Sequence, residues 1–398
     1  MSAAVGRRVA QWRVRRRMTQ QVFADRIGRS KSWVEKIERG ARSLDRFSLI
    51  CTVAEVLRID PAELLDANLQ STPAGVPAGV DAVRAALASY HAFAAAGSRS
   101  KVPNPADVAQ RVEHAWATYR HGDHPRLLRM LPELLGAVQH LHATGPAAGA
   151  ELQALAYQVT AQALVKVDEP DLAWLAADRA LATAGDDPLL ATAAAIPLGQ
   201  ALRGLGQSRL AMAATIAAAH RLTASANGIA DIEHKPLYGT LLLQAAVAAA
   251  GCGDTTAVTD LIGQAAAVAG QVEDGQDHRQ ATFGPAAVDC ARVSAAVTLG
   301  DASDAARRHP AIIRRNGWLR LPAEHRAAYL VDAARAFLHI GDLVAAGRTL
   351  VDADRLAPAE IRCRPTTRSV IAEIARSGPG SAGVGRLAAA LGLTVSVG

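Results

Sequence analysis

The sequence predicts an all-α protein with a small basic N-terminal domain followed by a long array of helices. Half of the 398 residues are hydrophobic and 20% are charged, which excludes a wholly disordered chain. Aromatic residues make up only 4%, and alanine runs recur at 193–195 and 217–219, so closely packed helices are favoured over β-sandwiches. No segment shows sustained strand alternation.

The net charge of +6 is concentrated at the N-terminus. Residues 1–66 hold 14 Lys and Arg against 8 Asp and Glu, so the rest of the chain is neutral. Six arginines crowd between Arg7 and Arg17. A basic cluster of this kind is typical of a domain that binds a polyanion such as nucleic acid.

A spacer rich in proline and glycine divides the chain. We expect one domain over 1–68, a linker over 69–80, a helical array over 81–376, and a flexible linker with a short helix over 377–398. Apolar residues at helical spacing predict helices over 108–120, 125–142, 151–167, 171–184, 188–205, 208–222, 236–250, 255–272, 286–299, 324–340 and 343–356.

One joint recurs between these helices, a Gly-Asp pair at 122–123, 253–254, 300–301 and 341–342. Glycine can take the left-handed conformation that ends one helix, and aspartate can cap the next. With Asp168 and Gly206 filling the gaps, the joints lie 38 to 47 residues apart, looser than a strict tetratricopeptide (TPR) period. This pattern predicts a TPR-like α-solenoid of about six helical hairpins. The alternative is an irregular helical bundle without a concave surface.

The stretch from Met18 to Gly40 predicts two short helices joined by a tight turn, a helix-turn-helix. Thr19 caps the first helix, Gly28 forms the turn and Ser30 caps the second helix, which Gly40 ends. The apolar residues between the helices are expected to be Ala24, Ile27, Val34 and Ile37, which leaves Lys31, Ser32, Glu35 and Lys36 projecting outward.

At these residues the chain closely resembles the Cro/phage-repressor (Xre) helix-turn-helix family, over about residues 7–66. The similarity includes Trp12 and Arg13 before the motif and Leu57 after it. The resemblance implies a five-helix DNA-binding domain whose second motif helix enters the major groove. Trp33 departs from the family pattern, because a small polar residue is usual there.

The resemblance also implies roles for single side chains. It places Ser30, Lys31, Ser32 and Lys36 at base edges, and Gln20, Arg29, Arg39 and Arg42 at phosphates. It further implies an internal ion pair between Arg13 and Glu38. A motif of this kind can instead serve protein contacts, which is the alternative interpretation.

Signatures of enzymes are absent from the sequence or lie in the wrong context. No Gly-Lys dipeptide occurs, which excludes a P-loop, and neither HExxH nor GxSxG is present. A GxGxxG match at 378–383 follows a predicted helix instead of a strand, so we interpret it as a linker. We therefore expect no enzymatic activity and no cofactor.

Metal, disulfide and membrane signals are equally weak. The histidines at 114, 121, 124, 140 and 142 lack a spacing that would place a defined pair on one helix face, so solvated loop histidines are expected. Four separate cysteines form no CxxC, which fits a reducing cytoplasm. The N-terminus lacks the apolar region of a signal peptide, and no segment is interpreted as a membrane span.

The concave wall of a helical superhelix is a place where polar and aromatic side chains can hold a ligand. The candidates for such a pocket are Tyr157, Gln158, Gln162, Gln200, Arg203, Tyr238, Gln244, Arg279, Phe283, Arg292, Tyr329, Asp332 and Arg335.

An Xre-type domain joined to a TPR-like array resembles the peptide-pheromone receptors of Gram-positive bacteria and many actinobacterial regulators. The arginine bias, 38 Arg to 5 Lys, suits a GC-rich genome such as that of an actinobacterium. The resemblance implies a sequence-specific transcriptional regulator that binds double-stranded DNA as a homodimer, held together by the repeat domain, and responds to a peptide or small molecule. The alternative is a DNA-tethered scaffold whose repeat array docks a protein partner.

Overall fold

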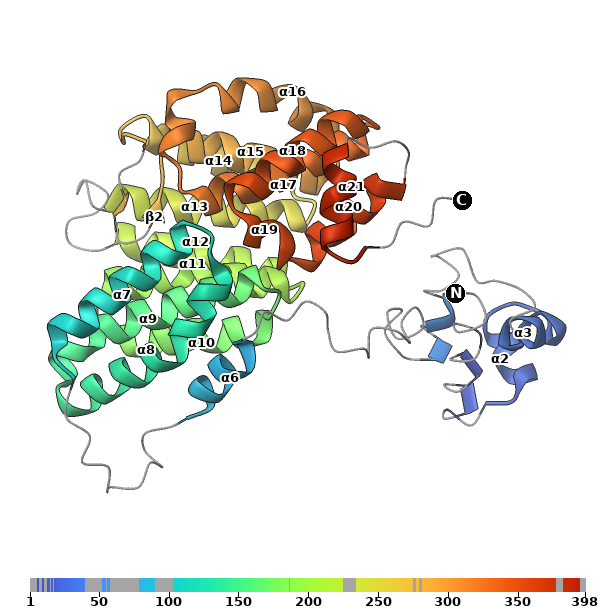
Figure 1. Cartoon of the computed structure of the whole chain (residues 1–398), viewed down its shortest axis with the longest axis horizontal. Coiled ribbons are helices and arrows are strands. Elements are labelled where there is room, and N and C mark those ends of the chain that lie inside the picture. Colours follow the sequence, from blue (N-terminus) through green and yellow to red (C-terminus); the bar gives the residue numbers. More distant parts are fainter. Residues whose placement is uncertain are drawn as a thin grey trace. The chain divides into compact units, whose positions relative to one another are not determined.

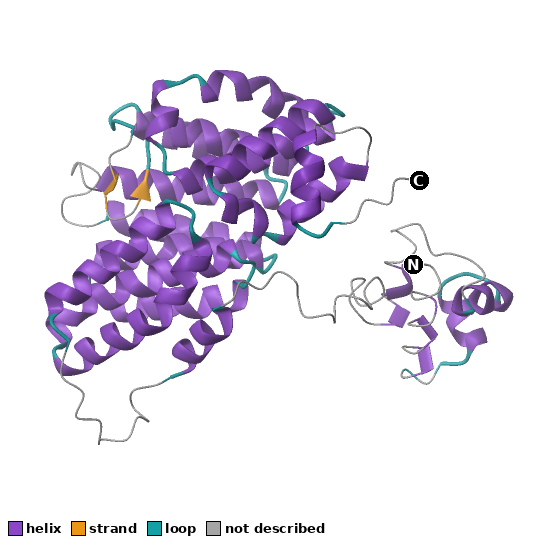
Figure 2. Ribbon diagram, in the orientation of Figure 1, coloured by secondary structure: helices purple, strands orange, loops and turns teal. Residues whose placement is uncertain are grey.

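The chain divides into two compact units, Met1–Ala74 and Gly75–Gly398. The computed structural model describes residues 6, 9–10, 13–14, 16, 18–39, 52–54, 56–57, 79–89, 103–185, 187–224, 234–274, 277–278, 281–376 and 382–393. Within these residues the regular elements are helices, apart from one pair of two-residue strands (Figure 2). The all-α prediction is therefore confirmed.

The N-terminal unit contains the two helices of the motif, α2 (Gln20–Arg26) and α3 (Lys31–Glu38). The Thr19 hydroxyl accepts a hydrogen bond from the backbone N–H of Val22, and the Ser30 hydroxyl accepts one from that of Trp33, both at 3.2 Å. Between the helices Gly28 has a φ of +64°, the left-handed conformation that suits glycine. The predicted caps and turn are therefore confirmed. Gly40 lies outside the described residues.

A small apolar core holds this unit together. It contains the four predicted residues, Ala24, Ile27, Val34 and Ile37, together with Val9, Phe23, Val53, Ala54 and Leu57. Arg16 adds a polar link, since its Nε donates to the carbonyl oxygen of Leu57 at 2.9 Å. The segments before and after the motif thus pack on it, although part of the expected five-helix set lies outside the described residues.

The second unit is a succession of antiparallel helices (Figure 1). They are α6 (Val80–Ala88), α7 (Pro105–Arg120), α8 (His124–Thr144), α9 (Pro146–Lys166), α10 (Pro170–Ala184), α11 (Pro188–Gly204), α12 (Ser208–Thr223), α13 (His234–Gly251), α14 (Thr255–Ala269), α15 (Pro285–Leu299), α16 (Ala302–Ile313), α17 (Ala323–His339), α18 (Leu343–Leu356), α19 (Pro358–Arg362), α20 (Pro365–Arg376) and α21 (Ala382–Ala390). The strands β1 (Asp277–His278) and β2 (Ala281–Thr282) form an antiparallel pair before α15, and a 3₁₀ helix, η3 (Asn316–Arg320), precedes α17.

Most helices from α7 to α18 pack mainly on their neighbours in sequence, as expected for a row of hairpins. In addition α7, α9, α11, α13, α15 and α17 each contact the next member of that series, so they form one continuous layer. This two-layer order is that of the predicted TPR-like solenoid. Helix α16 was not predicted, because alanines make up three of its five buried positions and leave little apolar periodicity.

The Gly-Asp joints form as the sequence predicts. The glycines at 122, 253, 300 and 341 have φ between +74° and +89°, and each following aspartate accepts a hydrogen bond from the backbone N–H three residues later. Asp168 and Gly206 occupy the same left-handed region at the two other joints. Local sequence therefore ends and restarts the helices at the expected places.

The last hairpin of the array returns to the first. Helix α17 contacts α7, and α19 contacts α8. At this closure a Cβ added to Gly122 would lie 2.8 Å from the Cβ of Ala357, so the absence of a side chain permits the approach. The inner layer is thereby closed around its own concave side.

Candidate functional site

The recognition face of α3 presents three polar side chains to solvent. Lys31, Ser32 and Lys36 are exposed, as predicted from the motif. The ammonium of Lys31 lies 3.8 Å from the carboxylate of Glu35, one turn further along the helix, but 55% of the Lys31 side chain remains accessible. Ser30 is exposed as well, although its oxygen already accepts the capping hydrogen bond from Trp33. These side chains are free to reach another molecule.

Arg13 and Glu38 form a bidentate ion pair beneath this face. The Arg13 guanidinium donates to Glu38 Oε1 at 2.6 Å and to Oε2 at 3.1 Å, and it also donates to the Met18 carbonyl at 2.7 Å. The side chains are only 12% and 7% exposed. Gln20 joins this network through a 2.7 Å hydrogen bond to Glu38. One of the two N–H donors of the Gln20 amide is thus used inside the protein, and the contact of Gln20 with a phosphate stays a prediction.

The remaining phosphate candidates differ in their surroundings. The Arg29 guanidinium lies 5.9 Å from the centroid of the Trp33 ring, a cation–π contact, and both Arg29 and Arg39 are exposed. Trp33 is half-buried and packs against the core of the unit, so its bulk is accommodated within the protein. Arg42 lies outside the described residues.

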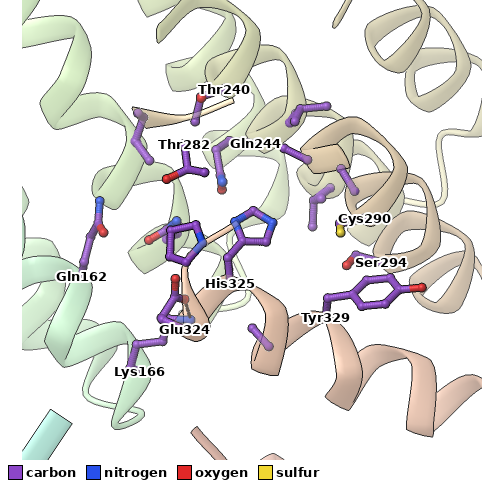
Figure 3. A pocket seen from close by; sticks show the side chains of 18 of the residues that line it. Gln162, Lys166, Thr240, Gln244, Thr282, Cys290, Ser294, Glu324, His325 and Tyr329 are labelled. Atoms are coloured by element: carbon purple, nitrogen blue, oxygen red, sulfur yellow. Dashed lines mark ion pairs between the residues drawn. The ribbon is translucent and has the colours of Figure 1, made fainter. Parts of the chain in front are cut away.

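The second unit contains a cavity of about 260 Å³ on the concave side of its inner layer. Its wall takes residues from α7, α9, α11, α13, α15 and α17, which is one helix from each hairpin of the array. In Figure 3, His325 lies centrally, between Gln162 and Lys166 on one side and Cys290 and Ser294 on the other. Six of the predicted pocket residues line it, namely Gln162, Gln200, Arg203, Gln244, Tyr329 and Asp332.

Three other candidates from the sequence are parts of the packed interior. The Tyr157 hydroxyl accepts a hydrogen bond from Gln139 at 2.9 Å, and the ring is 4% exposed. Gln158 is buried and donates to the Leu190 carbonyl at 3.3 Å. Phe283 is buried so closely against Gly239 that an added Cβ would lie 2.0 Å from its ring.

Three further candidates do not line the cavity either. Arg292 donates to Asp289 at 3.2 Å, and Arg335 donates to Asp332 at 3.4 Å. Tyr238 packs against neighbouring apolar clusters. Arg279 lies outside the described residues. A polar or aromatic residue on an alanine-rich helix therefore did not by itself identify the wall.

Sequence reasoning missed other residues of the wall, including Trp116, Tyr119, Lys166, Glu324 and His325. For Lys166 and His325 the sequence did contain a signal, namely their spacing from residues that were predicted. The wall residues of each inner helix recur three or four positions apart, as in Gln162–Lys166, Gln200–Arg203 and His325–Tyr329, because these positions share one helix face. Extending the predicted residues by this spacing would have found Lys166 and His325.

A buried charge cluster joins the cavity to the closure of the array. Glu360 is fully buried and its carboxylate meets His124 Nε2 at 2.8 Å, Lys166 Nζ at 3.0 Å and Arg364 Nη1 at 3.1 Å. Lys166 also pairs with Glu324 (Figure 3). Burial alone would raise the pKa of Glu360, but Lys166, His124 and Arg364 hold it well below its usual range. The expectation of a solvated His124 is corrected, since its side chain is buried.

Burial also sets the titration of the groups around the cavity. It lowers the pKa of His325 and, although Glu324 acts against this, keeps the imidazole neutral at pH 7. It raises the pKa of the Cys290 thiol and the Tyr329 hydroxyl. The Tyr329 hydroxyl lies 3.1 Å from His309 Nδ1, so the ring of this tyrosine is the part available to the cavity.

Among the described residues no group of three or more histidine, cysteine or acidic side chains could hold a metal ion. The same part of the chain has no helix with the length and hydropathy that a bilayer crossing requires.

Comparison with known proteins identifies the N-terminal unit. Residues 4–67 match the family described as helix-turn-helix domain, so this part of the chain is a helix-turn-helix domain. No curated protein matches the chain. A solved structure, that of Bacillus thuringiensis PlcR in complex with the peptide PapR7 and DNA, aligns with 78% of this chain and 94% of its own at 14% identity, with a TM-score of 0.38.

Proposed function

We propose that this protein is a ligand-responsive transcriptional regulator that binds DNA through its helix-turn-helix domain as a homodimer. The observation that carries the proposal is the cavity of the second unit, because its wall takes residues from one helix of every hairpin. A ligand bound there is surrounded by the inner helices of the array. Binding can then select one curvature of the array over another, provided that the ligand fits one geometry better.

The DNA-binding role is supported by the exposed face of α3. Lys31, Ser32 and Lys36 are exposed polar side chains on a helix that is capped at its start and anchored at Glu38. We assign them, with Ser30, to base edges in the major groove. Arg29, Arg39 and Arg42 are assigned to phosphates, because arginine on the flank of such a helix can reach the DNA backbone.

The dimer is assigned to the repeat unit. One helix-turn-helix contacts few base pairs, so two copies on half-sites about one helical turn apart are needed for tight binding. The N-terminal unit is small and strongly basic, and its own copies repel each other. The second unit is neutral and large, which suits an isologous twofold interface.

Footprinting tests the DNA assignment. We expect Lys31→Ala and Lys36→Ala each to cost about 1–3 kcal/mol of specific binding and to relax specificity at particular base pairs. Lys235→Ala, which changes a lysine of α13 in the second unit, is the matched control and should leave the footprint unchanged. An unaltered footprint for the Lys31→Ala/Lys36→Ala double variant would remove the recognition helix from the proposal.

A further inference from the structure

Arg203 is a cation in the cavity wall that lacks a carboxylate partner within the described part of the chain. Its Nη1 donates to the side-chain oxygen of Gln244 at 2.7 Å and to the Gln244 carbonyl at 3.3 Å, both of them neutral acceptors. Asp332 is the acidic group that acts on it electrostatically, but from beyond ion-pair distance. Burial lowers the pKa of Arg203 to about 10, so the side chain remains charged at pH 7.

Other charged side chains of the wall have partners within the protein. Lys166 pairs with Glu324 and with Glu360. Asp332 accepts hydrogen bonds from Ser294 and from Arg335. The carboxylates of the wall are therefore compensated, while the charge of Arg203 is not. Arg203 is half-buried. Withdrawing a charge from water without a counter-ion is costly, which favours a site that is completed by an anion from outside.

Two further groups of the wall point to a ligand. The indole N–H of Trp116 and the side-chain oxygen of Gln200 are buried without a hydrogen-bond partner, and both residues line the cavity. Gln200 precedes Arg203 by three residues on α11, so the two share a helix face. Buried polar groups are normally satisfied, and a ligand with its own acceptor and donor would satisfy these.

The size and the remaining lining limit what can bind. A cavity of about 260 Å³ lies just below the range that holds drug-sized ligands, so it suits a small metabolite better than a peptide of several residues. Leu243, Val247, Ala287 and Ala291 supply an apolar surface, to which Trp116 adds an aromatic one.

We infer that this cavity binds a small molecule that has an apolar body and one anionic group, a carboxylate or a phosphate, with the anion paired to Arg203. A hydroxyl or amine of the ligand donates to Gln200. The inference rests on the proposed function, because it names the class of effector that the regulator senses.

The test uses the full chain and three probes of similar size, 4-hydroxybenzoate, its amide 4-hydroxybenzamide, and phenyl phosphate. Melting temperature and calorimetric affinity are measured for the wild type and for Arg203→Gln. Arg209→Gln is the matched control, because Arg209 is exposed on α12 and does not line the cavity. An Arg203→Lys variant retains the charge and reports whether the geometry of the guanidinium matters.

We expect 4-hydroxybenzoate or phenyl phosphate to stabilise the wild type and Arg209→Gln, and the amide to stabilise neither. Whichever anion binds more tightly identifies the group that the site takes. Arg203→Gln should weaken that anion at least about tenfold, the effect of one charge-assisted hydrogen bond, and Arg203→Lys should weaken it less. Equal responses to the acid and the amide, the absence of a response to either anion, or an unchanged affinity in Arg203→Gln would overturn the inference.

DNA binding is measured on the same proteins by fluorescence anisotropy with genomic fragments. Anion binding without any sequence-specific DNA binding would refute the proposed function alone. Specific DNA binding together with failure of the anion test would refute this inference alone.

Discussion

At the scale of single residues, the helix-turn-helix domain depends on an ion pair that is almost removed from solvent. Arg13 and Glu38 are bound at two points, and Gln20 and Met18 satisfy further polar atoms around them. A shielded pair of this kind differs from a surface pair, because removing one partner leaves the other charge buried without compensation. Its main contribution is to hold the segment before the motif against the end of the recognition helix.

We expect Glu38→Gln to destabilise the isolated unit Met1–Ala74 by about 3 kcal/mol, because the Arg13 guanidinium would lose its counter-ion. The control is Glu35→Gln, three residues earlier, which breaks an exposed pair with Lys31 and should cost less than about 1 kcal/mol. Urea unfolding followed by circular dichroism measures both. Equal losses in the two variants would show that the Arg13–Glu38 pair contributes no more than a surface contact.

At the scale of elements, the closure of the array depends on a carboxylate that no local pattern identifies. Glu360 lies on the short helix α19 and meets His124 at the start of α8, Lys166 at the end of α9 and Arg364 beyond its own helix. Lys166 and Glu324 belong both to this cluster and to the cavity wall. Occupation of the cavity and closure of the array therefore involve the same side chains.

We expect Glu360→Gln to cost about 3–5 kcal/mol at pH 7, since it leaves buried cations without their shared counter-ion. The pKa of Glu360 is held below its usual value, so its contribution is complete above about pH 4.3, the unfolded pKa of glutamate, and is lost as the pH falls toward the folded pKa. The difference in unfolding free energy between wild type and variant should accordingly shrink below that pH.

Chemical denaturation from pH 7 down to pH 3 measures this difference. Glu133→Gln serves as the control, because Glu133 is 83% exposed in its pair with Arg111 and should show a small difference at every pH. If the difference in unfolding free energy between wild type and Glu360→Gln stayed constant from pH 7 to pH 3, the assignment of the low pKa to Glu360 would be contradicted.

At the scale of the whole molecule, the two units have separate cores and differ in net charge, the first being basic and the second neutral. The apolar cluster of the N-terminal unit contains residues from Val9 to Leu57, and the clusters of the second unit begin at Val80. The excess positive charge belongs to the first unit. Each unit is therefore expected to fold when expressed alone, so that DNA contact and self-association can be measured separately.

We expect residues 75–398 to sediment as a dimer and residues 1–74 as a monomer that binds DNA weakly, because the proposed interface lies in the repeat unit. Analytical ultracentrifugation of both fragments, beside the full chain, is the measurement. A monomeric repeat fragment next to a dimeric full chain would move the interface to the N-terminal unit. Monomers throughout would favour the alternative in which the array docks a different protein.

The sequence by itself determined the features that depend on neighbouring residues. Thr19, Gly28 and Ser30 set the ends of the motif helices, and the repeated Gly-Asp joints set those of the array, because caps and left-handed turns are made within a few residues of each other. Because these short joints connect successive helices, the arrangement of the helices in hairpins followed from the positions of the helix ends. The side-chain face presented by α3 followed from helical periodicity alone.

Only the tertiary structure decided which polar side chains meet across the array. Phe283 and Tyr157 had the same sequence signal as Tyr329, but the packing of Phe283 on Gly239 and of Tyr157 with Gln139 placed them in the interior. His124 and Glu360 are 236 residues apart and had no shared pattern. Such contacts depend on how several hairpins curve together, and that curvature is the sum of many small packing angles that no local segment encodes.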